Sequence, residues 1–78
     1  MKQWGIFVTK KQLNRVLRRI RRAKLDVFEV RELTFGERMM YLRDDLSLYL
    51  GEPHIIMFNA TEGEYDKFIC KYSLQKVF

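Results

Sequence analysis

Two short patterns fix where helices must begin in this chain of 78 residues. Each is a capping box, in which a threonine hydroxyl accepts from the backbone of the third residue after it, and that residue's side chain reaches back to the threonine. The first box runs from Thr9 to Gln12 and the second from Thr34 to Glu37. They predict two helices, and each helix is preceded by a segment that is not helical.

The spacing of apolar residues predicts how far these helices extend. Apolar residues recur at three- and four-residue intervals up to about Lys24, and a second stripe of this kind reaches about Leu50. Gly51 then suits the left-handed conformation of a helix C-cap, and Pro53 prevents the helix from resuming. The predicted helices therefore span about 9–24 and 34–50.

The remaining segments have the composition of strands. Residues 3–8, 27–33 and 54–60 are rich in β-branched and aromatic side chains. The last segment is ambiguous, because 68–74 alternates as a strand does while the apolar residues between 65 and 72 also fit a helix. We favour a strand there, with the polar residues 61–66, which include Gly63, as a hairpin loop.

This order predicts one α+β domain over residues 1–78. The succession β-α-β-α-β-β implies helical crossovers between neighbouring parallel strands and a closing antiparallel hairpin. The expected architecture is a four-stranded mixed sheet with two helices packed on one face. Folding of so short a chain hides roughly 60% of its surface, so a partner subunit would add stability.

Charge is distributed very unevenly along the chain. The net charge is +5, and every charged residue up to Lys24 is basic. From Asp26 onward, acids outnumber bases. A field polarised in this way attracts a polyanion or an acidic protein surface.

The first helix concentrates this positive charge on one side. On a helical wheel its apolar residues fall within about a third of the circumference. The opposite arc holds Lys11, Asn14, Arg15, Arg18, Arg19, Arg21 and Arg22. Like charges at this spacing repel, and the arginine fork matches phosphate, so the pattern favours binding of a polyanion. The alternative is that some of these arginines pair with acids of the same fold, such as Glu29, Glu32 or Asp44.

Residue types that support catalysis are isolated in this sequence. Cys70 is the only cysteine, His54 has no nucleophile or carboxylate placed by a motif, and the adjacent Asp44 and Asp45 point about 100° apart on a helix. No nucleotide-binding, protease or hydrolase motif occurs. We expect no catalytic residue, no metal, no cofactor and no membrane segment, and a reducing, cytoplasmic location.

Two apolar residues are predicted on the outer side of the second helix. Tyr41 and Leu48 lie there one above the other, among acidic residues. Together they predict a partner interface, with a homodimer as one possibility.

Two stretches of the sequence resemble the Alba superfamily of small DNA- and RNA-binding proteins. Residues 7–17 are similar to that family's strand exit, lysine pair and Asn-x-Val-Leu helix start, and residues 28–38 to its second strand and Gly-Arg turn. The resemblance implies nucleic-acid contacts at Lys10, Lys11 and Arg38, a flexible arm at 60–67, and a dimer.

The leading hypothesis is a non-catalytic nucleic-acid-binding protein. Phosphates would be held by Lys10, Lys11, Arg15, Arg18, Arg19, Arg22 and Arg38. Trp4 or Tyr72 would stack on a base if the DNA or RNA is single-stranded. The rival is a small, virus-encoded modulator or inhibitor that docks on a larger host machine that handles nucleic acid.

Overall fold

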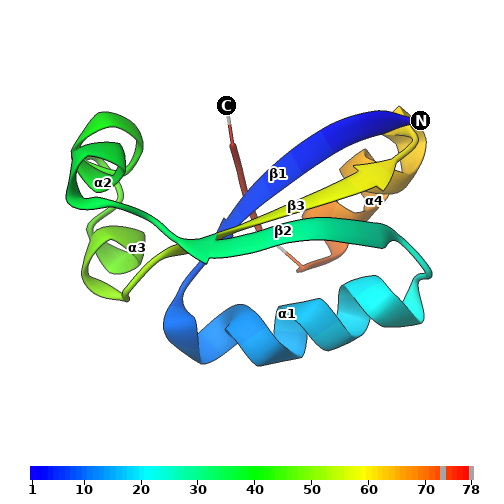
Figure 1. Cartoon of the computed structure of the whole chain (residues 1–78), viewed down its shortest axis with the longest axis horizontal. Coiled ribbons are helices and arrows are strands. Elements are labelled where there is room, and N and C mark those ends of the chain that lie inside the picture. The colour runs from blue at the N-terminus through cyan, green and yellow to red at the C-terminus, as the bar shows by residue number, and fades with distance from the viewer. Residues whose placement is uncertain (73, 78) are drawn as a thin grey trace.

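Three strands of seven residues form the sheet of this protein (Figure 1). The computed structural model describes residues 1–72 and 74–77. β1 (Lys2–Val8), β3 (His54–Ala60) and β2 (Asp26–Glu32) lie in the order β2-β3-β1, and the two-residue β4 (Gln75–Lys76) pairs with the free edge of β1. The helices are α1 (Lys10–Arg22), α2 (Phe35–Tyr41), α3 (Leu46–Leu50) and α4 (Glu62–Tyr72).

The predicted class, α+β, agrees with this structure, but the predicted mixed sheet with two helices is wrong. Every strand pairing among the described residues is antiparallel, and four helices accompany the sheet. β1 and β2 are not neighbours, because β3 lies between them and runs antiparallel to both. Setting α2 and α3 aside, the succession β-α-β-β-α-β is the arrangement called ferredoxin-like.

The predicted hairpin and last strand are replaced by α4. A third capping box begins this helix: the Thr61 hydroxyl accepts from the backbone N–H of Glu64 at 3.2 Å, and the Glu64 carboxylate accepts from the backbone N–H of Thr61 at 3.0 Å. Tyr65, Phe68 and Ile69 then point into the core at helical spacing. The flexible arm expected at 60–67 is therefore the end of β3 and the first turns of a packed helix.

The single helix predicted over 34–50 is two short helices. α2 ends at Tyr41, and α3 begins with Asp45 as its N-cap, whose carboxylate accepts from the backbone N–H of Leu48 at 3.2 Å. The break resets the helical register. Leu48, predicted on the outer side, is consequently 8% exposed and packs in the core.

The two faces of the sheet carry separate cores. The larger core joins alternate residues of β1 and β3, such as Ile6 and Phe58, to α1 and α4. The smaller core joins Phe7 and Ile55, which point to the opposite face, to Leu48 of α3. Helices α1 and α4 therefore share one face of the sheet, while α2 and α3 lie together at one end of the molecule (Figure 1).

Both ends of α1 are held by defined caps. The predicted capping box at Thr9 is present, with the Gln12 side chain accepting from the Thr9 backbone at 3.1 Å. At the other end, the backbone N–H groups of Lys24 and Leu25 donate to the carbonyls of Arg21 and Ile20 at 3.0 and 3.2 Å. This is the Schellman motif, and Lys24 takes its left-handed conformation with φ 61°.

The left-handed C-cap predicted at Gly51 is wrong. Gly51 has φ −88°, and the following residue, Glu52, adopts the positive φ of 54°. A glycine fits at position 51 for another reason, which is that neighbouring atoms come close to its Cα. A Cβ there would lie 2.6 Å from Cγ2 of Thr9 and 3.0 Å from the Ser47 carbonyl. Its own carbonyl accepts from the Lys10 backbone at 2.9 Å, so this loop also holds the start of α1 in place.

Candidate nucleic-acid interface

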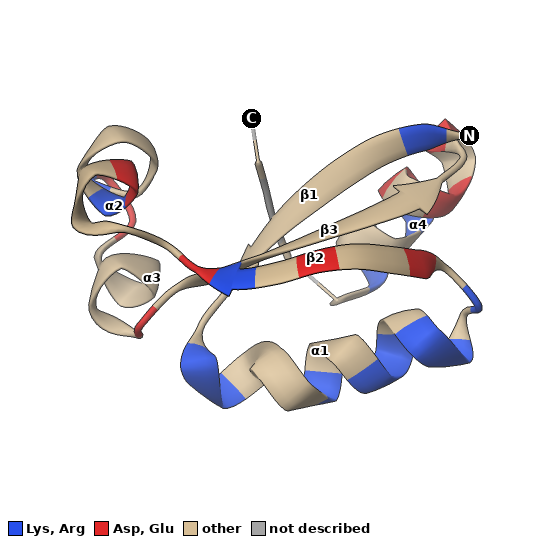
Figure 2. Cartoon of the chain, viewed as in Figure 1, with Lys and Arg blue, Asp and Glu red and all other residues tan. Residues whose placement is uncertain are grey.

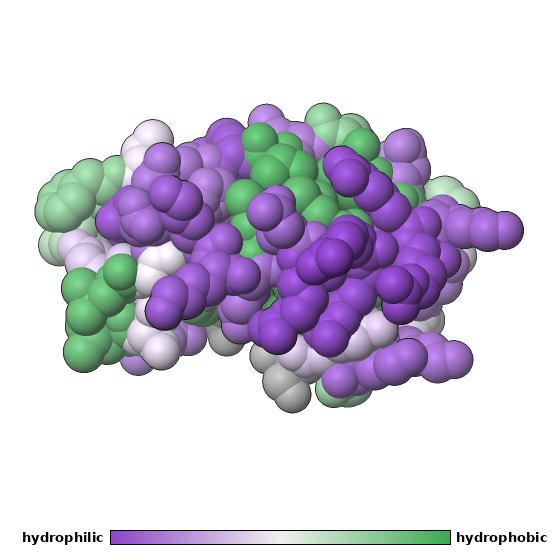
Figure 3. Space-filling view, turned by 90° about the horizontal axis from the view of Figure 1, so that it is seen from below, coloured by the Kyte–Doolittle hydropathy of each residue, from purple (hydrophilic) through white to green (hydrophobic). Residues whose placement is uncertain are grey.

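Lysine and arginine residues recur along the whole of α1 (Figure 2). Val16 and Ile20 are buried beneath the helix, whereas the outer residues Lys11, Arg15, Arg18, Arg21 and Arg22 are exposed and Arg19 is half-buried. Seen from the α1 side, hydrophilic surface covers this helix (Figure 3). The predicted cationic arc is therefore built on a rigid, capped helix.

The arginines of α1 form no ion pairs within residues 1–72 and 74–77. The ion pairs that do occur there involve Lys10, Arg31 and Arg38. Glu29 and Glu32, two of the acids considered as partners for α1, contact Arg31 and Arg38 instead. The positive charge of the α1 arginines is thus not compensated by ion pairs among the described residues.

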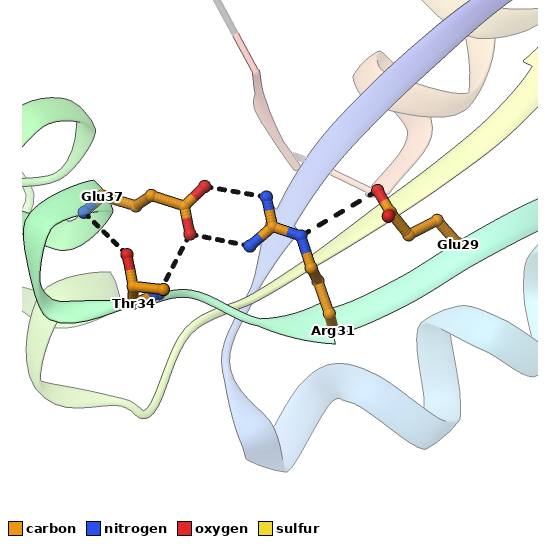
Figure 4. A network of polar contacts seen from close by, with 4 residues as sticks. All are labelled: Glu29, Arg31, Thr34 and Glu37. Atoms are coloured by element: carbon orange, nitrogen blue, oxygen red, sulfur yellow. Dashed lines mark hydrogen bonds and ion pairs between the residues drawn. The ribbon is translucent and has the colours of Figure 1, made fainter.

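A network of polar contacts at the end of β2 pairs two acidic side chains with one arginine (Figure 4). The two terminal nitrogens of Arg31 donate to the two oxygens of Glu37, each at 2.7 Å, and its Nε lies 3.9 Å from Glu29. Hydrogen bonds from Arg31, and next from the Thr34 backbone, lower the pKa of Glu37 to about 2. One arginine therefore compensates two carboxylates, on a different element from α1.

Arg38, predicted to contact nucleic acid, is also engaged in this region. Its Nη2 donates to Glu32 at 3.1 Å, and its side chain is 23% exposed. Arg38 lies in α2, which belongs to the end of the molecule built on the smaller core. The structure therefore does not bring Arg38 together with the cations of α1.

The lysine pair lies in the first turn of α1. Lys10 and Lys11 are both exposed, and Lys10 is 4.0 Å from Glu52, a distance at which an exposed pair contributes little. The structure places both lysines on the same helix as the five arginines. They extend the basic surface toward the N-terminal end of α1.

A cavity of about 310 Å³ lies between α1 and α4 at the other end of the basic face. Four cations line it, Arg19 and Arg22 from α1 and Lys67 and Lys71 from α4. Only one acid, Glu64, is among its lining residues, and that carboxylate is already bonded to the backbone of Thr61. These hydrogen bonds lower the pKa of Glu64 and tie its charge to the start of α4.

Two aromatic rings form the floor of this cavity. Phe68 and Tyr72 meet edge to face with their centroids 4.8 Å apart. The guanidinium carbon of Arg19 lies 4.4 Å from the centroid of Tyr72, and the Lys71 ammonium lies 5.5 Å from it. The cavity thus combines apolar ring surface with cations on both sides.

Lys67 and Lys71 were not predicted from the sequence as site residues. A strand over 68–74 puts these two lysines outside any helical face, whereas α4 places them one turn apart, beside α1. The signal that finds them is the capping box from Thr61 to Glu64, which lies inside the presumed hairpin loop. Once α4 is recognised, the four-residue spacing of the lysines follows.

The two aromatic residues proposed to stack on a base have different surroundings. Tyr72 lies in the cavity beside Arg19. Trp4 already stacks on Tyr65 at 4.2 Å with nearly parallel rings, and its Nε1 donates to the Ala60 carbonyl at 2.8 Å. The ring of Trp4 therefore has a role within the fold, and only Tyr72 adjoins the basic face.

Tyr41 and Leu48, predicted to form a partner interface, do not lie together on the surface. Tyr41 is 40% exposed, with its ring centroid 6.0 Å from that of Phe7, while Leu48 is buried. Besides Tyr41, five apolar residues at this end are exposed: Phe35, Met39, Met40, Leu46 and Leu50. His54, for its part, contacts the Glu52 carbonyl through Nδ1 at 2.8 Å.

Comparisons with protein-family models, with curated proteins and with solved structures found no match to this chain. Within the described part of the chain, no three His, Cys, Asp or Glu side chains are grouped so as to hold a metal ion. None of the helices described there is long and apolar enough to cross a membrane. The basic face is therefore the feature of this molecule from which a function can be inferred.

Proposed function

We propose that this protein binds nucleic acid, without catalysis, through the outer face of α1. One observation supports this most strongly: five arginines occupy one face of one helix with no ion pair to any described acid. Like charges three and four residues apart destabilise a helix by a few tenths of a kcal/mol for each pair. A phosphate backbone placed along this face relieves that repulsion.

The chemistry of arginine suits this ligand. The guanidinium presents a planar fork that donates two hydrogen bonds to a phosphate and stays charged at any physiological pH. Lys10 and Lys11 in the first turn of α1 and Lys67 and Lys71 of α4 extend the same positive surface at its two ends. Most contacts would be made to phosphate and sugar, so affinity exceeds sequence specificity. The exposed, unpaired Cys70 suits the reducing cytoplasm, where we place the protein.

Gel shifts at two salt concentrations test this proposal. The probes are single-stranded and double-stranded DNA and RNA of one length, and the variants are Arg22→Glu and Arg43→Glu. Both arginines are exposed and unpaired within the described residues, and both changes alter the net charge equally, but only Arg22 lies on α1. Arg22→Glu should weaken binding about tenfold, and Arg43→Glu less than twofold, with all shifts weaker at high salt. Equal effects of the two variants contradict the proposal.

The rival is a protein modulator whose basic face docks on an acidic cleft of a host machine and whose acidic surfaces fit a basic host site, and it has less support. Of the carboxylates on those acidic surfaces, Glu37 is paired with Arg31, Asp45 caps α3 and Glu64 accepts from the Thr61 backbone. Absence of any salt-sensitive shift, with all four probes, would favour this rival.

A further inference from the structure

We infer that the cavity between α1 and α4 receives one unpaired base, so that the ligand of this protein is a single strand. This inference rests on the proposed function, because it names the form of nucleic acid that the basic face binds. It adds to the proposal a subsite with defined walls and a floor.

The walls of the cavity suit the sugar-phosphate backbone. Arg19 and Arg22 from α1 and Lys67 and Lys71 from α4 line the same cavity. Each pair is three or four residues apart and so lies on one side of its helix. A nucleic-acid strand that follows the arginines of α1 therefore reaches this cavity, where cations of both α1 and α4 can contact its phosphates. Glu64, the one acidic lining residue, is held at the start of α4 by Thr61, so its charge is directed to a backbone N–H.

The floor of the cavity suits a base. Tyr72 is half-buried and lies over the larger core, with Phe68 against it edge to face. The guanidinium of Arg19 is 4.4 Å from the Tyr72 centroid and covers one face of that ring, so a base can stack on the outer side of the guanidinium plane or replace it on the ring. Stacking of this kind tolerates any base, because each has a π-face.

The size of the cavity limits how much of the ligand enters it. A volume of about 310 Å³ lies at the lower end of the range in which proteins bind small ligands. It therefore suits a single nucleotide. In a duplex the bases are stacked inside the helix, and only phosphates can meet the basic face. A single strand thus gains a contact that a duplex of the same charge lacks.

Fluorescence anisotropy with three labelled probes of equal length tests this inference. The probes are a single-stranded oligonucleotide, its duplex, and an abasic strand that keeps the phosphates and sugars but has no bases. The wild-type protein should bind the single strand about tenfold more tightly than the abasic strand, as expected for one stacked base. This comparison needs no substitution, so it does not depend on the folding of a variant.

Two substitutions locate the contact. Tyr72→Leu keeps an apolar side chain over the core but removes the ring, and Tyr72→Phe keeps the ring. Tyr72→Leu should lose most of the preference for the single strand over the abasic strand, whereas Tyr72→Phe should retain it.

The possible outcomes separate this inference from the proposed function. Binding of all three probes with similar affinity overturns the base subsite but leaves phosphate binding by α1 standing. A preference for the single strand that survives Tyr72→Leu places the base elsewhere and also overturns the inference. No binding of any probe overturns both.

The end of the molecule that is built by α2 and α3 carries several exposed apolar side chains. Phe35, Met39, Met40, Leu46 and Leu50, here called the apolar end, are between 49% and 71% exposed. Hydrophobic surface gathers at this end in Figure 3. The Tyr49 hydroxyl, 3.4 Å from the Met39 sulfur, ties the two helices together. With roughly 200 Å² for each side chain, about 600 Å² of apolar surface is left in water.

We propose that a second copy of the chain covers the apolar end. Its area approaches the roughly 800 Å² that each partner contributes to a stable interface, and a small chain gains most from such burial. Sedimentation velocity at about 100 µM should show a dimer. The double change Met40→Lys with Leu50→Lys, at exposed positions, should give a monomer, and Phe28→Lys, at an exposed position of β2, should not. A wild-type monomer, or a dimer that survives the double change, overturns this proposal.

Discussion

The loop between α3 and β3 allows a sharp test of the structure, because two adjacent residues should respond in opposite directions to substitution. A Cβ added at Gly51 meets Thr9 at 2.6 Å and the Ser47 carbonyl at 3.0 Å. The second of these contacts is with a backbone oxygen, which cannot move away by a change of side-chain rotamer. Glu52, in contrast, holds a left-handed φ of 54°, a conformation that disfavours every side chain.

The magnitudes follow from these two observations. Overpacking of this kind costs about 2 kcal/mol, so Gly51→Ala should lower the melting temperature by roughly 8–16 °C in a domain of this size. Glu52→Gly removes a left-handed penalty of about 1 kcal/mol and should raise the melting temperature by roughly 4 °C. The substitution also removes the ion pair between Glu52 and Lys10 at 4.0 Å, but this pair is exposed and contributes little to the free energy of unfolding.

Thermal unfolding followed by circular dichroism measures both changes. Gly63→Ala is the matched control, since a Cβ there meets nothing within 4 Å and alanine favours the helix α4. It should leave stability unchanged or raise it. If Gly51→Ala proves as stable as Gly63→Ala, the packing of this loop against Thr9, and with it the described start of α1, is wrong.

Three further predictions concern stability. Glu37 has a folded pKa of about 2, below its usual 4.5, so its contribution is present above about pH 4.5 and is lost as the pH falls toward 2; wild-type melting temperatures should therefore drop more steeply over this range than those of Glu37→Gln. Lys24→Gly should raise the free energy of unfolding by about 1 kcal/mol in urea titrations, because Lys24 has φ 61° at the end of α1. Ile20→Ala should lower it by about 3 kcal/mol in the same titrations, since Ile20 is fully buried under the basic face.

The parts of the fold that local signals determine were predicted well. The capping boxes at Thr9 and Thr34 are both present, and β1, β2 and β3 lie within one residue of their predicted ranges. These features depend on residues that are close in the sequence, so hydrogen bonding and periodicity suffice to find them. The cationic face of α1 belongs to the same group, because it follows from one helix alone.

The errors arose where one local signal was given preference over another. The box from Thr61 to Glu64 has the same form as those at Thr9 and Thr34, but the alternation after residue 67 predicts a strand instead. Asp45, predicted inside the second helix, is an N-cap that starts a new helix and changes which side Leu48 occupies. Recognition of these two caps predicts four helices instead of two.

Other features could not be predicted from local signals at all. The order β2-β3-β1 depends on pairings between residues far apart in the sequence, such as Trp4 with Phe58. The cavity beside Tyr72 likewise requires α1 and α4 to share one face of the sheet. The pairing of Glu29 and Glu37 with Arg31, which leaves α1 unpaired, also depends on the tertiary arrangement.

The dependence of binding on salt tests most directly whether the basic face of α1 holds phosphates. A labelled single strand should be titrated with the wild-type protein by fluorescence anisotropy at several salt concentrations between about 50 and 200 mM. If about four of the cations on α1 and α4 contact phosphates, the logarithm of the association constant should fall with the logarithm of salt at a slope of roughly −3. Affinity would then drop roughly 60-fold across that range. A flat dependence, or no binding at the lowest salt, contradicts the account.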